Sequence, residues 1–150
     1  MQTRPHASWD TIPEMVLSTA DRFGDAEAIV DGDLRITFEK LTDKVRTAAG
    51  AYIEAGARLG DRVAIWAPNS AEWIIAAFGL LTAGGVLVPV NTRFKAAEAD
   101  DIIRRSQAKL LLVRKTFLAS ISILATEKPI YRSLTSSGIS SPAAPRPSAR

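Results

Sequence analysis

The feature that most constrains the fold is a set of three short apolar runs separated by two segments of helical length. The runs are VAIWA (Val63 to Ala67), VLVPV (Val86 to Val90) and LLLV (Leu110 to Val113). Each run is too short for a helix and is bounded by polar or turn-forming residues, so each is predicted to be a buried strand. The alternation of strands with helices over short connections favours parallel pairing and right-handed crossovers. The middle of the chain is therefore predicted to be a parallel α/β layer.

Two helices are predicted between these strands. The first spans about residues 71–81 and is closed by a Gly-Gly pair, and the second spans Lys95 to Ser106 with Ile102 and Ile103 on its buried side. The run from Trp73 to Val90 is mostly apolar, but glycines and a proline break it. A buried helix followed by a strand is therefore favoured over a membrane span, which needs about 20 unbroken apolar residues.

The residues before this layer predict a helix, a hairpin and a longer helix. Thr11 can cap the first helix, and Gly24 ends it. Residues 28–38 predict two short strands around a tight Asp-Gly-Asp turn. Thr37 then caps a helix with apolar residues at 3.6-residue spacing, which Gly56 ends. The predicted fold class is α/β: a partial parallel-sheet layer (β-α-β-α-β) preceded by an α-helix and a β-hairpin, with a disordered C-terminal tail.

Changes in composition give the domain boundaries. Residues 1–10 are polar and are predicted to be a mobile arm, while residues 11–117 are predicted to form the folded domain. Residues 118–150 lose the pattern of the folded domain, and from Ile130 to Arg150 they are rich in Ser, Pro and Arg and lack an amphipathic period. Such a segment cannot bury enough apolar surface to offset its chain entropy, so it is predicted to be a divergent, disordered tail.

Composition also excludes several kinds of chemistry. The chain has no Cys, which excludes a disulfide framework, a Cys-ligated metal and a thiol nucleophile. Its single histidine, His6, excludes a metal site with two His ligands. The first ten residues contain no apolar leader segment, so the cytoplasm is the expected location.

Charge is distributed unevenly along the chain. Residues 1–101 hold 10 Lys and Arg against 15 Asp and Glu, whereas residues 102–150 hold 9 Lys and Arg against one acid, Glu127. This split indicates either a basic arm for nucleic acid or an anionic membrane, or a change of sequence character late in the chain. The basic residues are scattered and few aromatic residues lie among them, which favours the second interpretation and predicts no nucleic-acid partner.

Polar residues follow the first two predicted strands, at the edge where parallel sheets usually bind ligands. Asn69, Ser70 and Glu72 follow the first strand and could hold a ligand at the start of a helix. The favoured alternative is that Asn69 or Ser70 caps the helix while Glu72 interacts with its positive end. No Gly-rich dinucleotide fingerprint and no Walker-type phosphate loop occurs in the sequence.

Asn91, Thr92 and Arg93 follow the second strand at the same edge. Arg93 could bind a phosphate or carboxylate with two hydrogen bonds. The favoured alternative is structural: Asn91 forms a turn while Arg93 pairs with Glu98 or Asp100. Two further groups are predicted not to form sites, because adjacent helical carboxylates lie on different faces and dispersed tryptophans cannot stack. These groups are Asp100 with Asp101, and Trp9 with Trp66 and Trp73.

The order of several short motifs resembles the opening segment of the adenylate-forming (ANL) superfamily, and is most similar to fatty-acid–CoA ligases (acyl-CoA synthetases). The resemblance covers about residues 8–117. The motif residues that match are Thr37, Phe38 and Leu41; Gly60, Asp61, Arg62, Val63 and Ala64; Pro68, Asn69 and Ser70; Ala83 and Gly84; and Val88, Pro89 and Asn91.

This resemblance implies an ATP-dependent ligase that forms an acyl-adenylate and then an acyl-CoA thioester. Members of the family use a Ser/Thr/Gly-rich phosphate loop followed by Pro-Lys-Gly, an aromatic-Gly-x-Thr-Glu segment, a ribose-binding Asp and a C-terminal Lys. ATP, Mg²⁺ and CoA are the cofactors implied for the parent family, because the triphosphate needs donors and a cation to hold it.

None of these later segments occurs in the 150 residues, and the nearest imitation, residues 136–142, has Ser141 where the loop needs a Gly. No catalytic, cofactor-binding or metal-ligating residue is therefore assigned. The chain is expected to be a truncated relative that is inactive alone. Because the family pattern fades near Phe117, a frameshift with an early stop is a hypothesis for the origin of the tail.

Two other functions stay open. One is a non-catalytic α/β interaction module that docks on a full-length ligase or associates with itself through an exposed sheet edge. The other is a small Rossmann-like nucleotide binder, against which the missing Gly-rich loop argues. No transmembrane segment is predicted.

Overall fold

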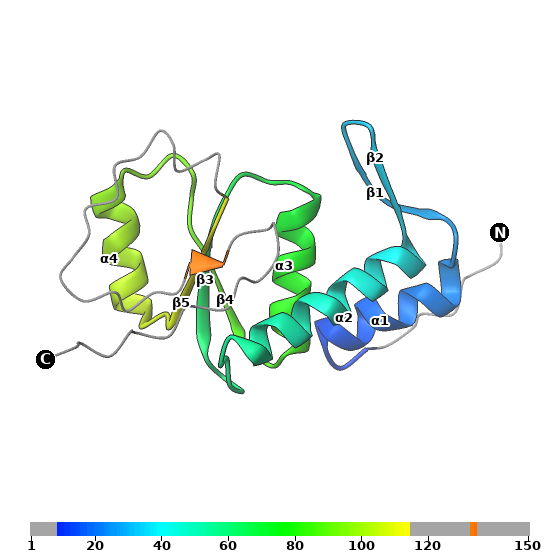
Figure 1. Ribbon diagram of the computed structural model, residues 1–150, viewed down its shortest axis with the longest axis horizontal. Coiled ribbons are helices and arrows are strands. Elements are labelled where there is room, and N and C mark those ends of the chain that lie inside the picture. The colour runs from blue at the N-terminus through cyan, green and yellow to red at the C-terminus, as the bar shows by residue number, and fades with distance from the viewer. Residues whose placement is uncertain (1–8, 115–132, 135–150) are drawn as a thin grey trace, which may run out of the picture.

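The computed structural model describes residues 9–114 and 133–134 (Figure 1). Some of the predicted features lie outside the described residues. They are His6, the segment 136–142 that resembles a phosphate loop, and most of the predicted tail. In chain order the elements are α1 (Ile12–Phe23), β1 (Glu27–Asp31), β2 (Leu34–Thr37), α2 (Phe38–Glu54), β3 (Arg62–Trp66), α3 (Ala71–Thr82), β4 (Val86–Pro89), α4 (Ala96–Ser106), β5 (Leu110–Val113) and β6 (Ser133–Leu134).

The main sheet has the strand order β4-β3-β5-β6, and every neighbouring pair is parallel. The chain leaves β3 for β4 on one side and then returns past β3 to β5 on the other side. Right-handed crossovers in these two directions must place their helices on opposite faces. Figure 1 shows this arrangement, with α4 on one face of the sheet and α1, α2 and α3 on the other. The predicted parallel α/β layer is therefore confirmed.

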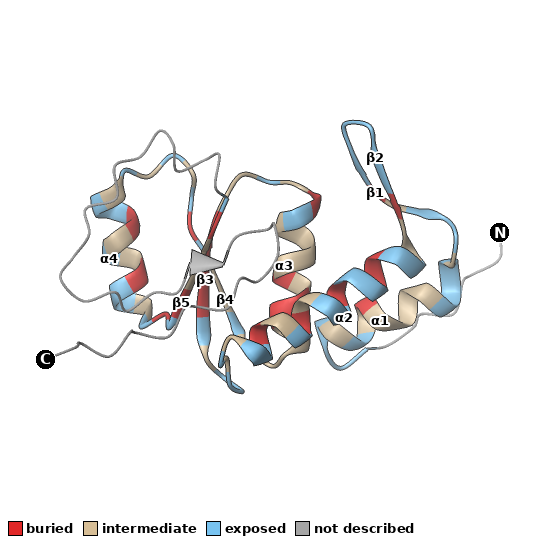
Figure 2. Ribbon diagram, viewed as in Figure 1, coloured by how far each residue is buried: buried red, intermediate tan, exposed pale blue. Residues whose placement is uncertain are grey.

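Alternate residues of β3 build two different cores, because successive side chains of a strand point to opposite faces. Val63 is fully buried and packs with Tyr52 of α2 and Leu80 of α3. Trp66 lies on the other face, where it packs with Ile103 of α4. Figure 2 shows buried residues on both sides of this central strand. Burial on both faces explains why the strand sequence is continuously apolar.

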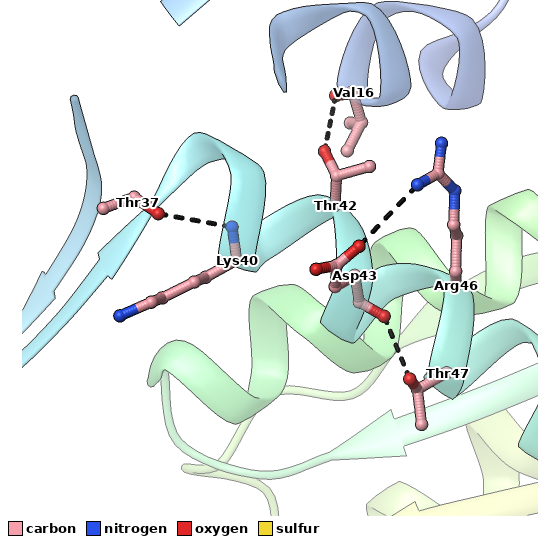
Figure 3. A network of polar contacts seen from close by, with 7 residues as sticks. All are labelled: Val16, Thr37, Lys40, Thr42, Asp43, Arg46 and Thr47. Carbon is pink, nitrogen blue, oxygen red and sulfur yellow. Dashed lines mark hydrogen bonds and ion pairs between the residues drawn. The ribbon is translucent and has the colours of Figure 1, made fainter. Parts of the chain in front are cut away.

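A third core joins the N-terminal elements to α3. It contains buried side chains from α1, the β1–β2 hairpin and α2, which pack with Ala71 at the start of α3. One buried hydrogen bond accompanies this packing: the hydroxyl of Thr42 donates to the carbonyl of Val16 over 3.5 Å (Figure 3). Thr42 is 1% exposed, so this contact gives its buried hydroxyl a partner and ties α1 to α2.

Helices α2 and α3 approach closely at Gly79. A Cβ atom added at this position would lie 2.5 Å from the Cβ of Ala48 and 3.2 Å from the backbone nitrogen of Ala49. The absence of a side chain therefore allows the two helix backbones to meet. The small residues on both helices, Gly79 on α3 and Ala48 and Ala49 on α2, explain why the two helices pack so closely.

The predicted caps and turns of the first half are confirmed. At the start of α1, the Thr11 hydroxyl accepts a hydrogen bond from Glu14 N over 3.2 Å. At the start of α2, the Thr37 hydroxyl accepts one from Lys40 N over 3.3 Å (Figure 3). The Asp-Gly-Asp turn joins the antiparallel strands β1 and β2. Gly24 caps the end of α1 with a positive φ of 47°.

Two details differ from the prediction. The run VLVPV was expected to be a buried strand, but β4 lies at the edge of the sheet and Val86 is 45% exposed. An apolar run does not reveal which strand ends the sheet, because edge and central strands can share a composition. The structure also contains β6, a two-residue strand within residues 118–150 that the sequence does not predict. Among the described residues, no helix is long and apolar enough to cross a membrane.

Candidate functional site at the carboxyl edge of the sheet

A crevice of about 340 Å³ opens beyond the carboxyl ends of β3 and β4. The chain leaves β3 toward α3 on one face and leaves β4 toward α4 on the other, so the two connections diverge. Diverging connections of this kind create the crevice in which open α/β sheets bind ligands. The lining residues are Ala67, Asn69, Trp73, Pro89, Val90, Asn91 and Thr92.

The start of α3 borders this crevice, and side chains of the protein occupy its first amides. Ser70 is the cap, because its hydroxyl accepts a hydrogen bond from Trp73 N over 3.3 Å. Asp31, from the hairpin turn 40 residues earlier, accepts a hydrogen bond from Ala71 N over 2.8 Å. The carboxylate of Glu72 accepts from its own backbone N–H. The prediction that Asn69 or Ser70 caps this helix is confirmed for Ser70.

Hydrogen bonds hold the pKa of Glu72 below its usual value. The largest contribution is from its own backbone N–H, followed by a hydrogen bond that the Ser70 hydroxyl donates, with a smaller effect of the positive charge on Arg114. Both Glu72 and Asp31 therefore bring carboxylates to the positive end of the α3 dipole. This arrangement stabilises the helix start and leaves no free amide there for an anion.

Asp31 is the residue that sequence reasoning missed at this site. The turn motif explained its type locally, and nothing in the sequence pairs position 31 with position 71. Only the packing of the hairpin against α2 and α3 brings the two together.

The connection after β4 is held by Asn91. Its side-chain oxygen accepts a hydrogen bond from Arg93 N over 2.9 Å, and its backbone carbonyl accepts one from the indole of Trp66 over 3.1 Å. The predicted turn at Asn91 is therefore confirmed. Trp66 is 3% exposed, so its N–H needs this partner. The contact fixes the end of β3 against the loop that follows β4.

The predicted pairing of Arg93 with an acid of the next helix is wrong. Glu98 instead accepts a hydrogen bond from Lys95 N over 2.7 Å at the start of α4. Asp100 pairs with Arg104 over 2.8 Å, one turn further along the same helix. Local pairs on one helix are the shorter contacts available to these carboxylates. Arg93 is exposed, and its side chain makes no ion pair within the described part of the chain.

The remaining predicted groups do not form a shared site. Asp101 pairs with Arg105 over 3.5 Å, separately from the pair that Asp100 makes. The three tryptophans lie in different places: Trp9 donates to Ser18 over 2.8 Å, Trp66 is in the core beside α4, and Trp73 lines the crevice. The members of each group therefore lie apart, as their spacing in the sequence predicted.

The opposite edge of the sheet holds a second carboxylate with a shifted pKa, that of the motif residue Asp61. Its carboxylate accepts hydrogen bonds from Lys109 Nζ over 2.5 Å and from Arg58 N over 3.0 Å. These contacts, the one with Lys109 first, hold the pKa of Asp61 below its usual value. Asp61 thus ties the turn before β3 to the residue before β5, which is a structural role.

The residues at the crevice do not fit the ATP and Mg²⁺ that the family resemblance implies. None of the lining side chains is charged, and the amides at the start of α3 already have partners. Within residues 9–114 and 133–134, no three His, Cys, Asp or Glu side chains gather in a way that could hold a metal ion. The crevice can offer amide, hydroxyl and indole groups to a neutral ligand or to another polypeptide segment.

Comparison with known proteins places this chain among the adenylate-forming enzymes. The family model described as "AMP-binding enzyme" matches residues 17–145, and so extends past residue 117. The 3-[(3aS,4S,7aS)-7a-methyl-1,5-dioxo-octahydro-1H-inden-4-yl]propanoyl:CoA ligase of Rhodococcus jostii is 44% identical over 110 residues, which is 73% of this chain and 21% of that ligase. The mitochondrial medium-chain acyl-CoA ligase ACSF2 of Mus musculus is 33% identical over 117 residues, which is 77% of this chain and 19% of that protein. The chain therefore spans about a fifth of the length of these curated relatives.

Solved structures share the fold. The N-terminal subdomain of Klebsiella oxytoca NpsA, in complex with 3-hydroxyanthranilyl-AMSN, has 25% sequence identity and a TM-score of 0.66. That match covers 69% of this chain and 26% of the NpsA chain. The nonribosomal peptide synthetase FmoA3 has a TM-score of 0.76 at 23% identity, and the match covers 89% of this chain and 14% of FmoA3. The fold described above thus recurs as a part of larger chains.

Proposed function

Because the chain belongs to the AMP-binding enzyme family, we propose that it supplies the N-terminal segment of an acyl-CoA ligase. The observation that carries the proposal is the 44% identity to the Rhodococcus jostii ligase over 110 residues. The full ligase would activate a fatty acid or another carboxylic acid. The carboxylate attacks the α-phosphate of ATP and releases pyrophosphate, and the thiol of CoA then displaces AMP to give the thioester. The names of the relatives, which are acyl-CoA ligases, support this reaction class.

The role proposed for this segment is structural. The central strand β3 is enclosed on one face by α1, α2 and α3 and on the other by α4. Hydrogen bonds of Asp31, Ser70 and Asn91 hold the loops at the carboxyl edge of the sheet. The lack of charged groups in the crevice supports the proposal that ATP, Mg²⁺ and CoA are bound by other parts of the full ligase. The 150-residue chain alone is then expected to be inactive.

Two assays test this proposal. The purified chain is incubated with ATP, Mg²⁺, CoA and a medium-chain fatty acid, and pyrophosphate release is measured. No release above background is expected. Release that depends on the acid and on CoA would overturn the proposed inactivity.

The second assay tests the ligase assignment itself. Residues 9–114 of this chain replace the matching segment of the Rhodococcus jostii ligase, and the chimera is assayed for thioester formation with that enzyme's own acid. The chimera is expected to keep activity, and a matched chimera with Gly79→Val, which blocks the approach of α2 and α3, is expected to lose it. A chimera that keeps Gly79 and is folded but inactive would contradict the assignment.

A second function is an interaction module that docks on a full-length ligase. It is supported by the occurrence of the same fold within the larger chain of FmoA3. Leu59, which is 87% exposed, and Ile53, which is 60% exposed, are apolar side chains that such a contact would cover. Co-elution of the tagged chain with a full-length ligase supports docking, and its loss in a Leu59→Lys variant assigns the surface. A monomeric chain that never co-elutes removes this function.

A cytoplasmic location is part of the proposal. The ACSF2 relative is mitochondrial by name, which makes the mitochondrion the competing compartment. Cell fractionation with an antibody against the chain decides between the two.

A further inference from the structure

The outer edge of β4 is the place where a second chain could add a strand to the sheet. β4 ends the sheet in the described part of the chain, and β3 is its single neighbour. Edge strands present unpaired backbone groups and can therefore pair with another molecule. Val86 adds an exposed apolar side chain to this edge.

The hydrogen bonds to β3 show which groups of β4 point outward. Val86 N donates to the carbonyl of Asp61 over 2.8 Å, and Val90 N donates to the carbonyl of Ile65 over 3.0 Å. In a parallel pair the residues that bond to one neighbour alternate with those that face away from it. Positions 86, 88 and 90 therefore bond to β3, and the backbone groups of Leu87 and Pro89 point to the outer side.

Proline at the second outward position changes what this edge can offer. Pro89 has no N–H, so Leu87 supplies the one outward N–H between the first and last residues of β4. An added strand needs donors at alternate positions to form a continuous ladder. Proline is common on edge strands for this reason, because it stops pairing while a short strand keeps its contacts on the inner side.

We propose that Pro89 prevents a second copy of this chain from pairing along β4. The proposal revises the expectation of self-association through an exposed sheet edge, because it removes the β4 edge from the available surfaces. It does not depend on the ligase assignment, since it rests on backbone hydrogen bonds alone.

The test compares the wild-type chain with Pro89→Val and Pro89→Ala. Both substitutions restore the missing N–H, and valine also has a high strand propensity. Sedimentation equilibrium at increasing concentration gives the average mass, and circular dichroism verifies that each variant is folded. Wild type is expected to show no β4-mediated association, and Pro89→Val is expected to shift to dimers or larger species, with Pro89→Ala between them. Adding Val86→Lys to Pro89→Val is expected to return the mass to that of wild type, because a charged residue opposes edge pairing.

Hydrogen exchange at Leu87 provides a readout that does not depend on mass. In wild type this outward amide is expected to exchange fast at all concentrations, and in Pro89→Val its exchange is expected to slow as concentration rises. A wild-type Leu87 amide that becomes protected with concentration would overturn the proposal. A folded Pro89→Val with the same mass and the same Leu87 exchange as wild type would also overturn it. If both Pro89 variants fail to fold, the concentration series on wild-type Leu87 still tests whether copies of the chain pair along β4, and protection of this amide overturns the proposal.

Discussion

Lys109 donates a hydrogen bond to the carboxylate of Asp61, which lies 48 positions earlier in the chain. The two residues precede β5 and β3, so their contact joins the amino ends of neighbouring strands. The backbone of Lys109 also donates to the carbonyl of Arg62 over 2.8 Å. The side chain of Asp61 is 12% exposed and that of Lys109 is 63% exposed, so the carboxylate is the less accessible partner.

The first prediction concerns the pH dependence of this contact. Because the pKa of Asp61 is lowered in the folded state, the carboxylate stabilises the fold above its unfolded pKa of about 4, and this stabilisation is lost as the pH falls through the lower folded value. Asp61→Asn is therefore expected to lower the free energy of unfolding at pH 7 and to approach wild type below about pH 4. Urea unfolding across this pH range measures the difference.

Two variants make the test specific. Asp33→Asn, at an exposed turn position, is expected to behave as wild type at every pH. Lys109→Met is expected to remove most of the Asp61→Asn effect when the two are combined, as coupled partners do. A difference between Asp61→Asn and wild type that stays constant from pH 7 to pH 3 would contradict the prediction.

The second prediction compares two glycines that both lie within helices. Gly79→Ala places a Cβ 2.5 Å from that of Ala48 and within 3.2 Å of backbone atoms that cannot move aside, so it is expected to lower the free energy of unfolding by about 1–3 kcal/mol. Gly50→Ala meets nothing within 4 Å and is expected to raise it by about 0.5–1 kcal/mol, because alanine favours the helix. Chemical unfolding of the two variants is expected to give changes of opposite sign in the free energy of unfolding.

Ala48→Gly provides the matched rescue. In the Gly79→Ala background it removes the nearest contact but not the backbone atoms, so recovery is expected to be partial. Equal effects of alanine at positions 50 and 79 would show that the close approach of α2 and α3 does not limit stability.

The third prediction concerns a buried hydroxyl. Tyr52 is 3% exposed, and its OH has no hydrogen-bond partner in the described part of the chain. An unsatisfied buried polar group carries a desolvation cost, so Tyr52→Phe is expected to raise the free energy of unfolding by about 1 kcal/mol. Thermal unfolding measures this gain, and a clear loss of stability would reveal a partner for the hydroxyl.

Alkaline pH supplies a separate readout for the same residue. Burial raises the pKa of Tyr52, so its protonated form is favoured in the folded state. The associated stability is present below the unfolded value of about 10 and is lost as the pH rises above it. Wild type is therefore expected to lose more stability than Tyr52→Phe between pH 9 and pH 11, and parallel curves would contradict this.

The fourth prediction concerns the hydrogen bond between the hairpin and α3. Asp31→Ala removes the acceptor for Ala71 N and is expected to cost about 1 kcal/mol, the usual effect of losing a side-chain cap. Asp33→Ala lies in the same turn with no such contact and serves as the control. Amide exchange of Ala71 is expected to accelerate in the first variant alone. Equal exchange in both variants would show that the carboxylate does not protect this amide.

Local signals predicted most of the fold. The caps at Thr11 and Thr37 and the strand at Leu110–Val113 depend on neighbours in sequence, and these were predicted correctly. The order of the strands depends on which pairs meet in space, so the exposed position of β4 was not predicted.

The site shows the same division. Ser70 and Asn91 act on residues two or three positions away, and their roles followed from residue type and spacing. The hydrogen bond from Ala71 N to Asp31 spans 40 positions, and the one from Lys109 to Asp61 spans 48. No local sequence pattern predicts either contact. Arg93 was paired with the wrong partners because nearer cations and a backbone amide take the acids of α4.

The position of β3 between β4 and β5 has a consequence for synthesis on the ribosome. Once Val90 has left the exit tunnel, β3 can pair with β4 through a short connection, and one side of it is then complete. Its other side stays open until Val113 has emerged, and the apolar residues that will face α4 stay uncovered until Ser106 has emerged. The nascent chain thus passes through a stage in which a half-built sheet exposes its central strand, and a chaperone that binds extended apolar segments would meet it there.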